Sequence, residues 1–293
     1  MSQAMRKSHR VEFPGRRGHL AGILEIPNRE FPNREFPNSE FPNSEMPDKE
    51  PRGWILFSHC FTCNKDLKAI VRIARGLADC GWGVLRYDFS GLGGSQGTFS
   101  ETNFTTNCED LQSAAEFLSK EYQAPRFLLG HSFGGAASFA MAEKITSVAG
   151  VIALAAPSDT YHLADLLVRM DPDIASLGHG TVSIGGQKLQ IRRQMVEDFR
   201  SHDLGATVAS LRKPLLVFHS PEDETVGFYH AIRNAGYDRD PRTNTHEGYQ
   251  GDSGRTLVAL PGSNHLLTNN EKDIPMIVSI AHAWCTRLNG GNS

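Results

Sequence analysis

The sequence has no apolar run long enough to cross a membrane. Its longest wholly apolar stretch, residues 148–156, includes one glycine and falls far short of the roughly 20 residues that a spanning helix needs. No apolar segment of the kind found in secretory signals follows the basic start MSQAMRKSHRVEFPG. We therefore expect neither a membrane span nor secretion, and we expect a cytoplasmic location.

An excess of charge of one sign is also missing. The 293 residues include 30 Lys and Arg against 33 Asp and Glu, which gives a formal net charge of −3. Proteins that bind nucleic acids or anionic membranes usually concentrate basic residues on one face, so we expect neither partner. With 39% hydrophobic and 22% charged residues, the composition is that of a globular protein.

Cysteine is scarce, and its number is odd. Five cysteines in a chain of this length argue against a disulfide framework. Cys60 and Cys63 form a C-x-x-C motif, but no second C-x-x-C or H-x-H completes a zinc site. We expect ordinary buried thiols here, with a redox pair as the alternative, and we expect neither a metal nor a cofactor.

Residues 26–50 are a tandem repeat with a period of five, IPNRE FPNRE FPNSE FPNSE MPDKE. The period is too short for a solenoid, and the proline in each copy removes a backbone donor that a sheet would need. We interpret the repeat as an extended surface loop; the alternative is a docking segment that presents its phenylalanines at regular intervals. Residues 236–254, which are polar and rich in Gly, Pro and Asn, predict a second surface insertion.

Apolar runs of strand length alternate with helix-period stretches around these insertions. Strands are predicted at 53–59, 82–89, 126–130, 148–156, 214–220 and 255–260. Helices are predicted at 66–80, 107–122, 135–144 and 274–288. This alternation predicts a mostly parallel central sheet with helices on both faces, an α/β fold. We expect a single domain over residues 1–293, with residues 158–210 as a helix-rich lid insertion.

Ser132 lies in a context that predicts a nucleophile elbow. Residues 130–134, GHSFG, directly follow the strand RFLLG and precede a helix rich in Gly and Ala. An elbow needs this strand–turn–helix order, in which the two glycines let strand and helix approach. Ser95 and Ser253 also stand in Gly-rich motifs but lack that context, so we do not expect them to react.

A serine nucleophile needs an imidazole to take its proton and a carboxylate to fix the tautomer of that imidazole. Asp223 follows strand 214–220, at the edge where parallel sheets gather functional groups. The alternatives are Glu222, Glu224 and Asp159, or a helix-capping role for the acidic cluster. His265 follows the last strand and is the predicted base. We expect His59, His131 and His219, at other strand ends, to support the site through hydrogen bonds.

Over residues 11–288 the chain resembles the α/β-hydrolase superfamily. Six motifs resemble the hydrolase half of proteins that fuse an α/β hydrolase to an OsmC-type domain: SHCFTCNKD (58–66), VLRYDFSGLGGSQGTF (84–99), LGHSFGG (129–135), VSIGGQ (182–187), VFHSPEDETVG (217–227) and NHLL (264–267). The resemblance implies an α/β-hydrolase fold, a triad of Ser132, Asp223 and His265, and esterase activity. Because it covers the hydrolase half alone, it implies no peroxide reduction.

The oxyanion of an acyl-transfer intermediate needs two hydrogen-bond donors. One is the backbone N–H of Phe133, the residue after the nucleophile. Residues 59–61 stand where related enzymes carry His-Gly-x, so we predict that the N–H of Phe61 is the other. Cys60 replaces the glycine of that motif.

The predicted function is that of a carboxylic ester hydrolase that cleaves small-molecule esters with short acyl groups through an acyl-enzyme intermediate. The same residues could instead serve a thioesterase, an amidase or a C–C bond hydrolase. A non-catalytic protein that binds a partner on this scaffold is a further alternative, as is thiol redox chemistry at Cys60 and Cys63.

Overall fold

The computed structural model describes residues 6–27, 50–237, 254–270 and 272–290. Most of the repeat 26–50 and of the insertion 236–254 lies outside these ranges, so both interpretations stay predictions. Within the described ranges, no helix combines the length and the apolar character that a membrane crossing requires.

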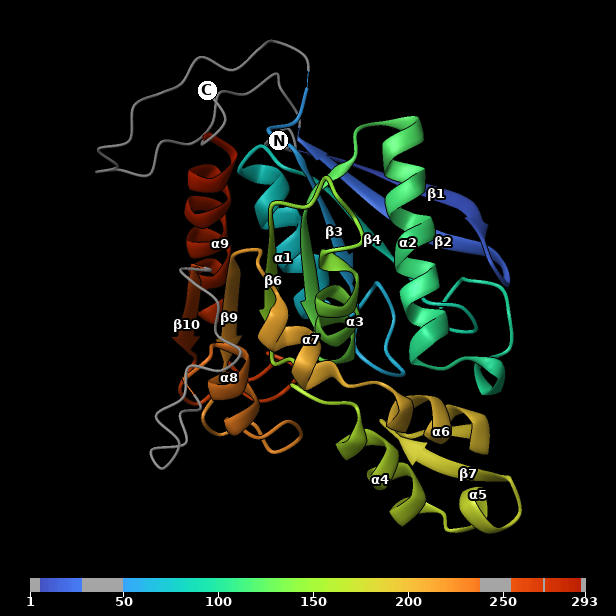
Figure 1. The fold of residues 1–293 in the computed structure, drawn as a ribbon. Coiled ribbons are helices and arrows are strands. Elements are labelled where there is room, and N and C mark those ends of the chain that lie inside the picture. Colours follow the sequence, from blue (N-terminus) through green and yellow to red (C-terminus); the bar gives the residue numbers. More distant parts are fainter. Residues whose placement is uncertain (1–5, 28–49, 238–253, 271, 291–293) are drawn as a thin grey trace.

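An eight-stranded sheet forms the centre of the described molecule (Figure 1). The hairpin of β1 (Arg6–Gly15) and β2 (Gly18–Pro27) lies at one edge, where β2 pairs antiparallel with β4. The parallel strands follow in the order β4 (Gly83–Tyr87), β3 (Trp54–Ser58), β5 (Pro125–His131), β6 (Gly150–Leu154), β9 (Leu215–His219) and β10 (Arg255–Ala259). The predicted mostly parallel sheet is confirmed.

Helices cover both faces of the sheet because its central strands are apolar on both sides. In β3, the side chains of Ile55 and Phe57 lie on one face of the sheet, here called the first face. Those of Trp54 and Leu56 lie on the opposite face, here called the second face. The first face is covered by α1 (Lys68–Asp79) and α9 (Asp273–Asn289), and the second by α2 (Phe104–Glu121) and α3 (Phe133–Ala142). Short elements η1 (Phe99–Glu101) and α8 (Tyr229–Asn234) follow β4 and β9.

Residues 158–210, here called the cap segment, join β6 to β9. The segment contains α4 (Tyr161–Met170), α5 (Asp173–Ser176), β7 (His179–Ile184), β8 (Gln187–Arg192), α6 (Arg193–Ser201) and α7 (Leu204–Ser210). Helices form most of the segment, and the β7–β8 hairpin within it is not predicted from the sequence. It turns at Gly185 and Gly186, which both have positive φ, as a two-residue hairpin turn requires. Figure 1 places α4, α5 and α6 beyond the carboxyl ends of the parallel strands.

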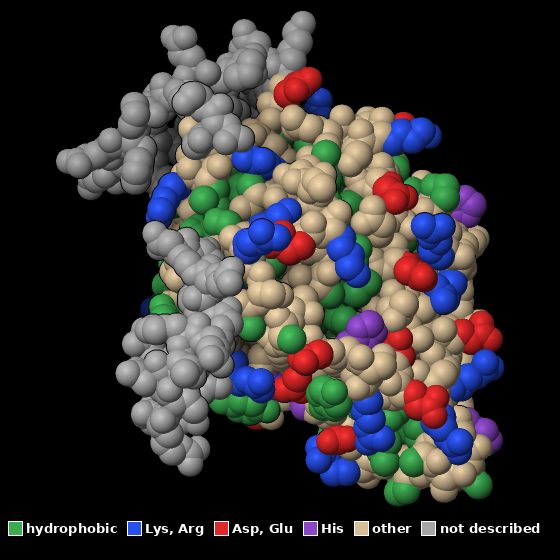
Figure 2. Space-filling model, viewed as in Figure 1, with side chains coloured by type: hydrophobic (Ala, Val, Ile, Leu, Met, Phe, Trp, Pro, Cys, Tyr) green, Lys and Arg blue, Asp and Glu red, His purple; other side chains and the backbone are tan. Residues whose placement is uncertain are grey.

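Charged side chains of both signs are interspersed over the face drawn in Figure 2. The cap segment also exposes large apolar side chains, among them Tyr161, Leu166, Met170 and Leu177. Its inner side is apolar as well, because Ile174, Val182, Ile191, Met195 and Phe199 are buried against the core that α2 and α3 share. The cap segment is therefore packed onto the sheet domain, and its role as a lid stays a prediction.

Candidate active site

The candidate site lies at the carboxyl ends of β3, β5, β9 and β10, which share one edge of the sheet. The chain leaves β3 toward α1 on the first face and leaves β5 toward α3 on the second face. Adjacent strands whose connections diverge in this way leave a crevice between them, and α/β proteins bind ligands at such a point. The side chains predicted to react come from the loops at this end of the sheet.

Ser132 occupies a tight turn between β5 and α3. Its φ of 53° and ψ of −120° lie outside the regions that non-glycine residues favour. A Cβ on Gly130 would come within 2.3 Å of the Gly134 carbonyl oxygen, and a Cβ on Gly134 within 2.4 Å of the Ser58 carbonyl oxygen. The two glycines are therefore required for the close approach of strand and helix, as the GHSFG motif predicts.

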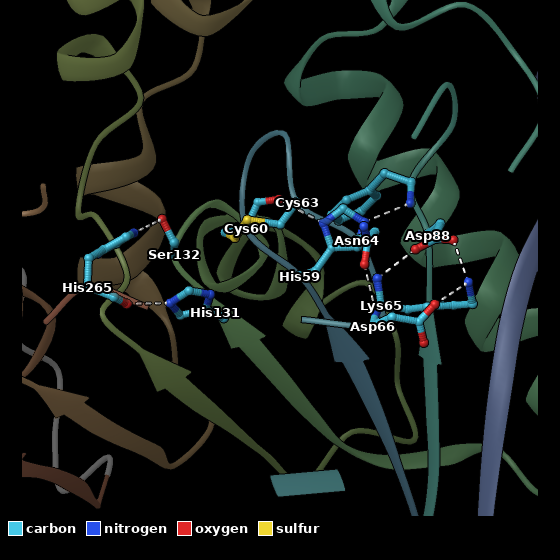
Figure 3. The surroundings of a disulfide bond; sticks show 11 residues. His59, Cys60, Cys63, Asn64, Lys65, Asp66, Asp88, His131, Ser132 and His265 are labelled. Carbon is cyan, nitrogen blue, oxygen red and sulfur yellow. Dashed lines mark hydrogen bonds and ion pairs between the residues drawn. A yellow bond between two sulfur atoms is a disulfide. The ribbon is translucent and has the colours of Figure 1, made fainter. Parts of the chain in front are cut away.

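The structure brings the three predicted side chains of the site together. His265 Nε2 lies 2.9 Å from Ser132 Oγ, and His265 Nδ1 lies 2.8 Å from Asp223 Oδ2 (Figure 3 shows the contact with Ser132). The exposed fractions of Ser132, His265 and Asp223 are 8%, 7% and 6%. Because the carboxylate accepts the Nδ1 proton, Nε2 presents a lone pair to the hydroxyl, which is the arrangement a general base needs.

Asp223 is fixed by its own turn. Its Oδ1 accepts the N–H groups of Thr225 at 2.8 Å and Val226 at 2.9 Å, which leaves Oδ2 for His265. Burial alone would raise the pKa of Asp223, but the hydrogen bonds from His265 and the two N–H groups outweigh it and hold the pKa below its usual value. The carboxylate is therefore ionised at neutral pH.

The other carboxylates near Asp223 face elsewhere. Glu222 accepts hydrogen bonds from Gly262 N–H at 2.9 Å and from the Ser220 hydroxyl at 3.1 Å, so it joins the acid loop to the loop before His265. Asp159 contacts His162 rather than His265. The structure thus pairs His265 with Asp223 and leaves Glu222 as a tether between two loops.

Three buried histidines hold the loops of the site, as predicted. His59 donates from Nδ1 to Cys60 O at 2.7 Å and accepts Phe89 N–H at Nε2; His131 donates to His265 O at 2.8 Å. His219 donates to Val226 O at 2.7 Å and so braces the acid turn. Burial lowers the pKa of all three, in His131 to about 3 with help from the neighbouring His265. They are neutral hydrogen-bonding groups at physiological pH.

The two predicted oxyanion donors lie in adjacent, packed segments. Phe133 is the first residue of α3, so its N–H has no partner within the helix. The rings of Phe61 and Phe133 contact each other with centroids 5.5 Å apart. Among the described residues, neither N–H donates to a backbone carbonyl outside the regular elements. Their role as oxyanion donors stays a prediction.

The expectation of ordinary thiols at the C-x-x-C motif is wrong. Cys60 and Cys63 form a disulfide, with their Cα atoms 5.4 Å apart (Figure 3). The sulfurs meet because residues 60–63 form a tight turn, closed by a hydrogen bond from Cys63 N–H to Cys60 O at 3.2 Å. Thr62 has a φ of 63° in this turn, a conformation that β-branched residues rarely adopt. Cys80, Cys108 and Cys285 are free thiols, as expected.

A second His–Asp cluster, not predicted from the sequence, lies where the cap segment leaves β6. It contains Asp159, His162 and His230, whose potential ligand atoms lie within 4.8 Å of one another. The Asp-x-x-His spacing at residues 159–162 is the signal that could have indicated it. Burial, with His162 nearby, lowers the pKa of His230 to about 4. The donor set suits a transition metal, but Arg233 approaches Asp159 to 3.7 Å and already supplies positive charge.

Ser158 does not turn this cluster into a second nucleophile site. Its hydroxyl lies 2.9 Å from His230 Nδ1, and the same nitrogen lies 3.6 Å from Asp159 Oδ2. A proton relay needs the serine and the carboxylate on different ring nitrogens. His230 Nδ1 also accepts Ser158 N–H at 3.1 Å, so the contact joins the start of the cap segment to α8.

Ser95, which also stands in a Gly-rich motif, has a structural role. Ser95 accepts Ala21 N–H at 2.9 Å and donates to Asp88 O at 2.6 Å, which ties its loop to β2 and to the end of β4. Ser253 lies outside the described residues.

Both the sequence and the structure of the chain match known proteins. The sequence profile of the serine aminopeptidase S33 family matches residues 49–203, which is more than half of the chain. The solved esterase domain of a Rhodothermus marinus protein is 33% identical, with a TM-score of 0.68, over 97% of this chain and all of that one.

More distant relatives are known from mammals. Palmitoyl-protein thioesterase ABHD10, mitochondrial, of Rattus norvegicus is 24% identical over 188 residues, which are 62% of each chain. The chain thus spans less than two thirds of that curated relative. The solved alpha/beta hydrolase domain-containing protein 10 from mouse shares the fold, with a TM-score of 0.68 and 16% identity over 96% of this chain and 99% of that one.

Proposed function

The chain belongs to the serine aminopeptidase S33 family of α/β hydrolases, and we propose that it is a serine esterase acting on small esters. One observation carries the proposal: Ser132 Oγ, His265 and Asp223 are joined in a line by contacts of 2.9 and 2.8 Å. The esterase domain from Rhodothermus marinus, one third identical over nearly the whole chain, supports the same activity.

In the proposed reaction, His265 Nε2 takes the Ser132 proton while Oγ attacks the acyl carbonyl carbon. The N–H groups of Phe61 and Phe133 bind the resulting oxyanion, and Asp223 stabilises the imidazolium. The C–O bond to the alcohol then breaks, and His265 gives its proton to the leaving oxygen. Water, deprotonated by His265, attacks the acyl-enzyme and releases the acid, and Ser132 regains its proton.

The substrate class follows from what surrounds the nucleophile. The half-buried ring of Phe61 packs against Phe99, Phe133 and Phe199, with centroids 5.5 to 5.9 Å apart. Among them, the rings of Phe61 and Phe99 are partly exposed and suit a short acyl group, and Phe61 contacts Phe133, the residue after Ser132. Each oxyanion donor supplies about 2.7–4 kcal/mol to the transition state, judged from the removal of such a donor in subtilisin.

The experiment that tests the proposal compares Ser132→Ala with wild type on p-nitrophenyl acetate. We expect kcat to fall by about 10⁶, to the residual rate that binding and the oxyanion donors sustain. A fluorophosphonate probe should label wild type at Ser132 and leave the variant unlabelled.

Ser158→Ala is the matched control, because Ser158 also lies beside a histidine and an aspartate. It should retain both turnover and labelling. Unchanged turnover in Ser132→Ala would contradict the proposal. Absence of any adduct at Ser132 would instead favour a non-catalytic binding protein.

A thioesterase is the second candidate, favoured by the likeness to the rat protein of that name. The Ser132 arrangement suits either leaving group, because an alkoxide and a thiolate both depart from the same tetrahedral intermediate. Ratios of kcat/KM on matched ester and thioester substrates with the same acyl chain separate the two. A ratio that strongly favours the thioester would replace the esterase proposal.

A further inference from the structure

We infer that the Cys60–Cys63 disulfide positions the Phe61 N–H for the oxyanion, so that turnover at Ser132 depends on this bond. The inference rests on the proposed function, because it concerns the same reaction. It assigns a role to a crosslink that the triad itself does not use. Figure 3 shows the disulfide between Ser132 on one side and the Lys65–Asp88 pair on the other.

The loop that carries Phe61 is held firmly at both ends. At its start, the buried His59 ring bonds to Cys60 O at 2.7 Å and to Phe89 N–H at 3.1 Å. At its end, the buried Asp88 carboxylate accepts both the main-chain N–H of Lys65, at 2.6 Å, and its ammonium group, at 2.8 Å. The end at Lys65 therefore stays in place whether or not the disulfide is present. At the other end, His59 holds the carbonyl of the peptide unit that joins Cys60 to Phe61, and the N–H of this unit is that of Phe61.

The middle of the loop depends on the crosslink. Thr62 holds a φ of 63°, in the left-handed region that is unfavourable for a β-branched residue. A single hydrogen bond at 3.2 Å, Cys63 N–H to Cys60 O, closes the turn alongside the disulfide. Without the S–S bond, Thr62 gains by relaxing to an extended conformation, which opens the turn and breaks the hydrogen bond from Cys63 N–H to Cys60 O. The peptide unit that carries the Phe61 N–H then keeps only the contact of its carbonyl with His59.

Packing of the Phe61 ring does not replace the crosslink. The ring contacts Phe99, Phe133 and Phe199, and these contacts fix the side chain. The peptide unit that carries the N–H can still tilt about its remaining contact with His59 while the ring keeps its position. An oxyanion donor must be fixed to within a few tenths of an ångström of its working position, so a small rotation is enough to weaken it.

The bond is open to chemical reduction in the folded protein. Cys63 is half-buried, whereas Cys60 is 3% exposed, so a small dithiol can attack at the Cys63 sulfur. Dithiothreitol would give two electrons and two protons to the S–S bond. The products are two cysteine thiols and cyclic oxidised dithiothreitol, and a disulfide oxidant such as oxidised glutathione reverses the step.

The test compares wild type, dithiothreitol-reduced wild type and Cys60→Ser/Cys63→Ser on p-nitrophenyl acetate. We expect kcat to fall at least tenfold in the last two, and by no more than the 10²–10³ that loss of an entire donor produces, while KM stays within twofold. Affinity for a trifluoromethyl ketone, whose adduct with Ser132 carries an oxyanion, should fall by the same factor. Oxidised glutathione should restore kcat to the reduced wild type and leave the double variant unchanged.

Cys80→Ser is the matched control, because Cys80 is a partly exposed free thiol at the end of α1, away from the site edge. It should keep wild-type kcat and the full response to dithiothreitol. Unchanged kcat after confirmed reduction, or a fall in kcat with unchanged affinity for the ketone, would overturn the inference. If the proposed esterase function itself is wrong, the result differs: oxidised wild type would neither turn over the ester nor be labelled at Ser132.

Discussion

At the scale of single residues, the geometry of Asp223 decides the protonation pattern of the site. Its Oδ1 is occupied by two N–H groups of its own turn, so only Oδ2 faces His265. A carboxylate oxygen can only accept there, which keeps the proton of His265 on Nδ1. An amide in the same place could offer an N–H instead and would select the opposite tautomer, in which Nε2 can no longer accept the Ser132 proton.

We therefore expect Asp223→Asn to lower kcat by about 10⁴, the size of the loss for the equivalent change in a serine protease. Ester turnover under saturating substrate measures it. Asp159→Asn is the control, because Asp159 bonds to His162 and should leave kcat within twofold. The reverse result, with Asp159 essential and Asp223 dispensable, would reassign the acid.

Sequence order was sufficient to find the three side chains that meet at the site, because each follows a predicted parallel strand and such strand ends share one edge. The disulfide could not be found in this way. Its closure depends on the left-handed conformation of Thr62, and threonine carries no local preference for it. The contacts of His59, His131 and His219 were predictable in kind, but their partners depend on the packed loops.

At the scale of elements, the approach of α3 to the end of β3 sets the distance between the Ser132 turn and the loop that carries Phe61, the predicted oxyanion donor; this loop is here called the oxyanion loop. Gly134 is the point of contact, since a Cβ there would lie 2.4 Å from Ser58 O and 2.5 Å from His59 O. Both atoms belong to the main chain, so no side-chain rotation can relieve the clash. The helix or the loop would have to move.

We expect Gly134→Ala to lower the free energy of unfolding by about 1–3 kcal/mol or more, because it overpacks a main-chain contact. Urea denaturation measures the loss, and kcat should fall with it as the oxyanion loop shifts. Gly290→Ala, where a Cβ would meet nothing within 4 Å, should stay within about 0.5 kcal/mol of wild type. Equal stabilities for the two variants would show that the elbow tolerates the methyl group.

Most elements could be predicted from the sequence because the buried strands are near-continuous apolar runs. Strand β3, predicted at 53–59, spans Trp54–Ser58, and α9, predicted at 274–288, spans Asp273–Asn289. The β1–β2 hairpin gives no such run, since β1 reads RKSHRVEFPG and is largely exposed. Strand β7 alternates between exposed and buried residues over only six positions, one of them Gly180, and β8 buries only Ile191 fully, so neither stands out beside the helical stretches around them.

At the scale of the whole molecule, buried histidines make stability sensitive to acid. Burial is the first cause that lowers the pKa of His59, His131, His219, His230 and His282, to about 3 in His131 and about 4 in His230 and His282. In the unfolded chain these groups take up protons below about pH 6.5, while the folded protein keeps them neutral. Each one then favours unfolding by up to about 1.4 kcal/mol per pH unit.

We expect the free energy of unfolding to fall steeply between about pH 6.5 and pH 4, and urea denaturation at pH 7 and pH 5 measures the fall. His282→Gln isolates one contribution, because His282 accepts Trp82 Nε1–H at 3.0 Å and glutamine can still accept it. The difference between the two pH values should shrink by about 1 kcal/mol, allowing for partial solvation of the ring. An equal fall in variant and wild type would exclude His282 as a contributor.

The repeat joins the sheet at the end opposite Ser132, and the residue that follows the second insertion lies at that end too. Glu25, near the end of β2, pairs with Val84, and Trp54 at the start of β3 pairs with Gly83, so residues 28–49 leave and re-enter at the beginnings of the parallel strands. Arg255, after residues 238–253, pairs with Leu215 at the same edge. Both points at which the repeat joins the described sheet therefore lie at the end of the parallel strands opposite Ser132, so any change in the number of pentads is anchored to the sheet at that end.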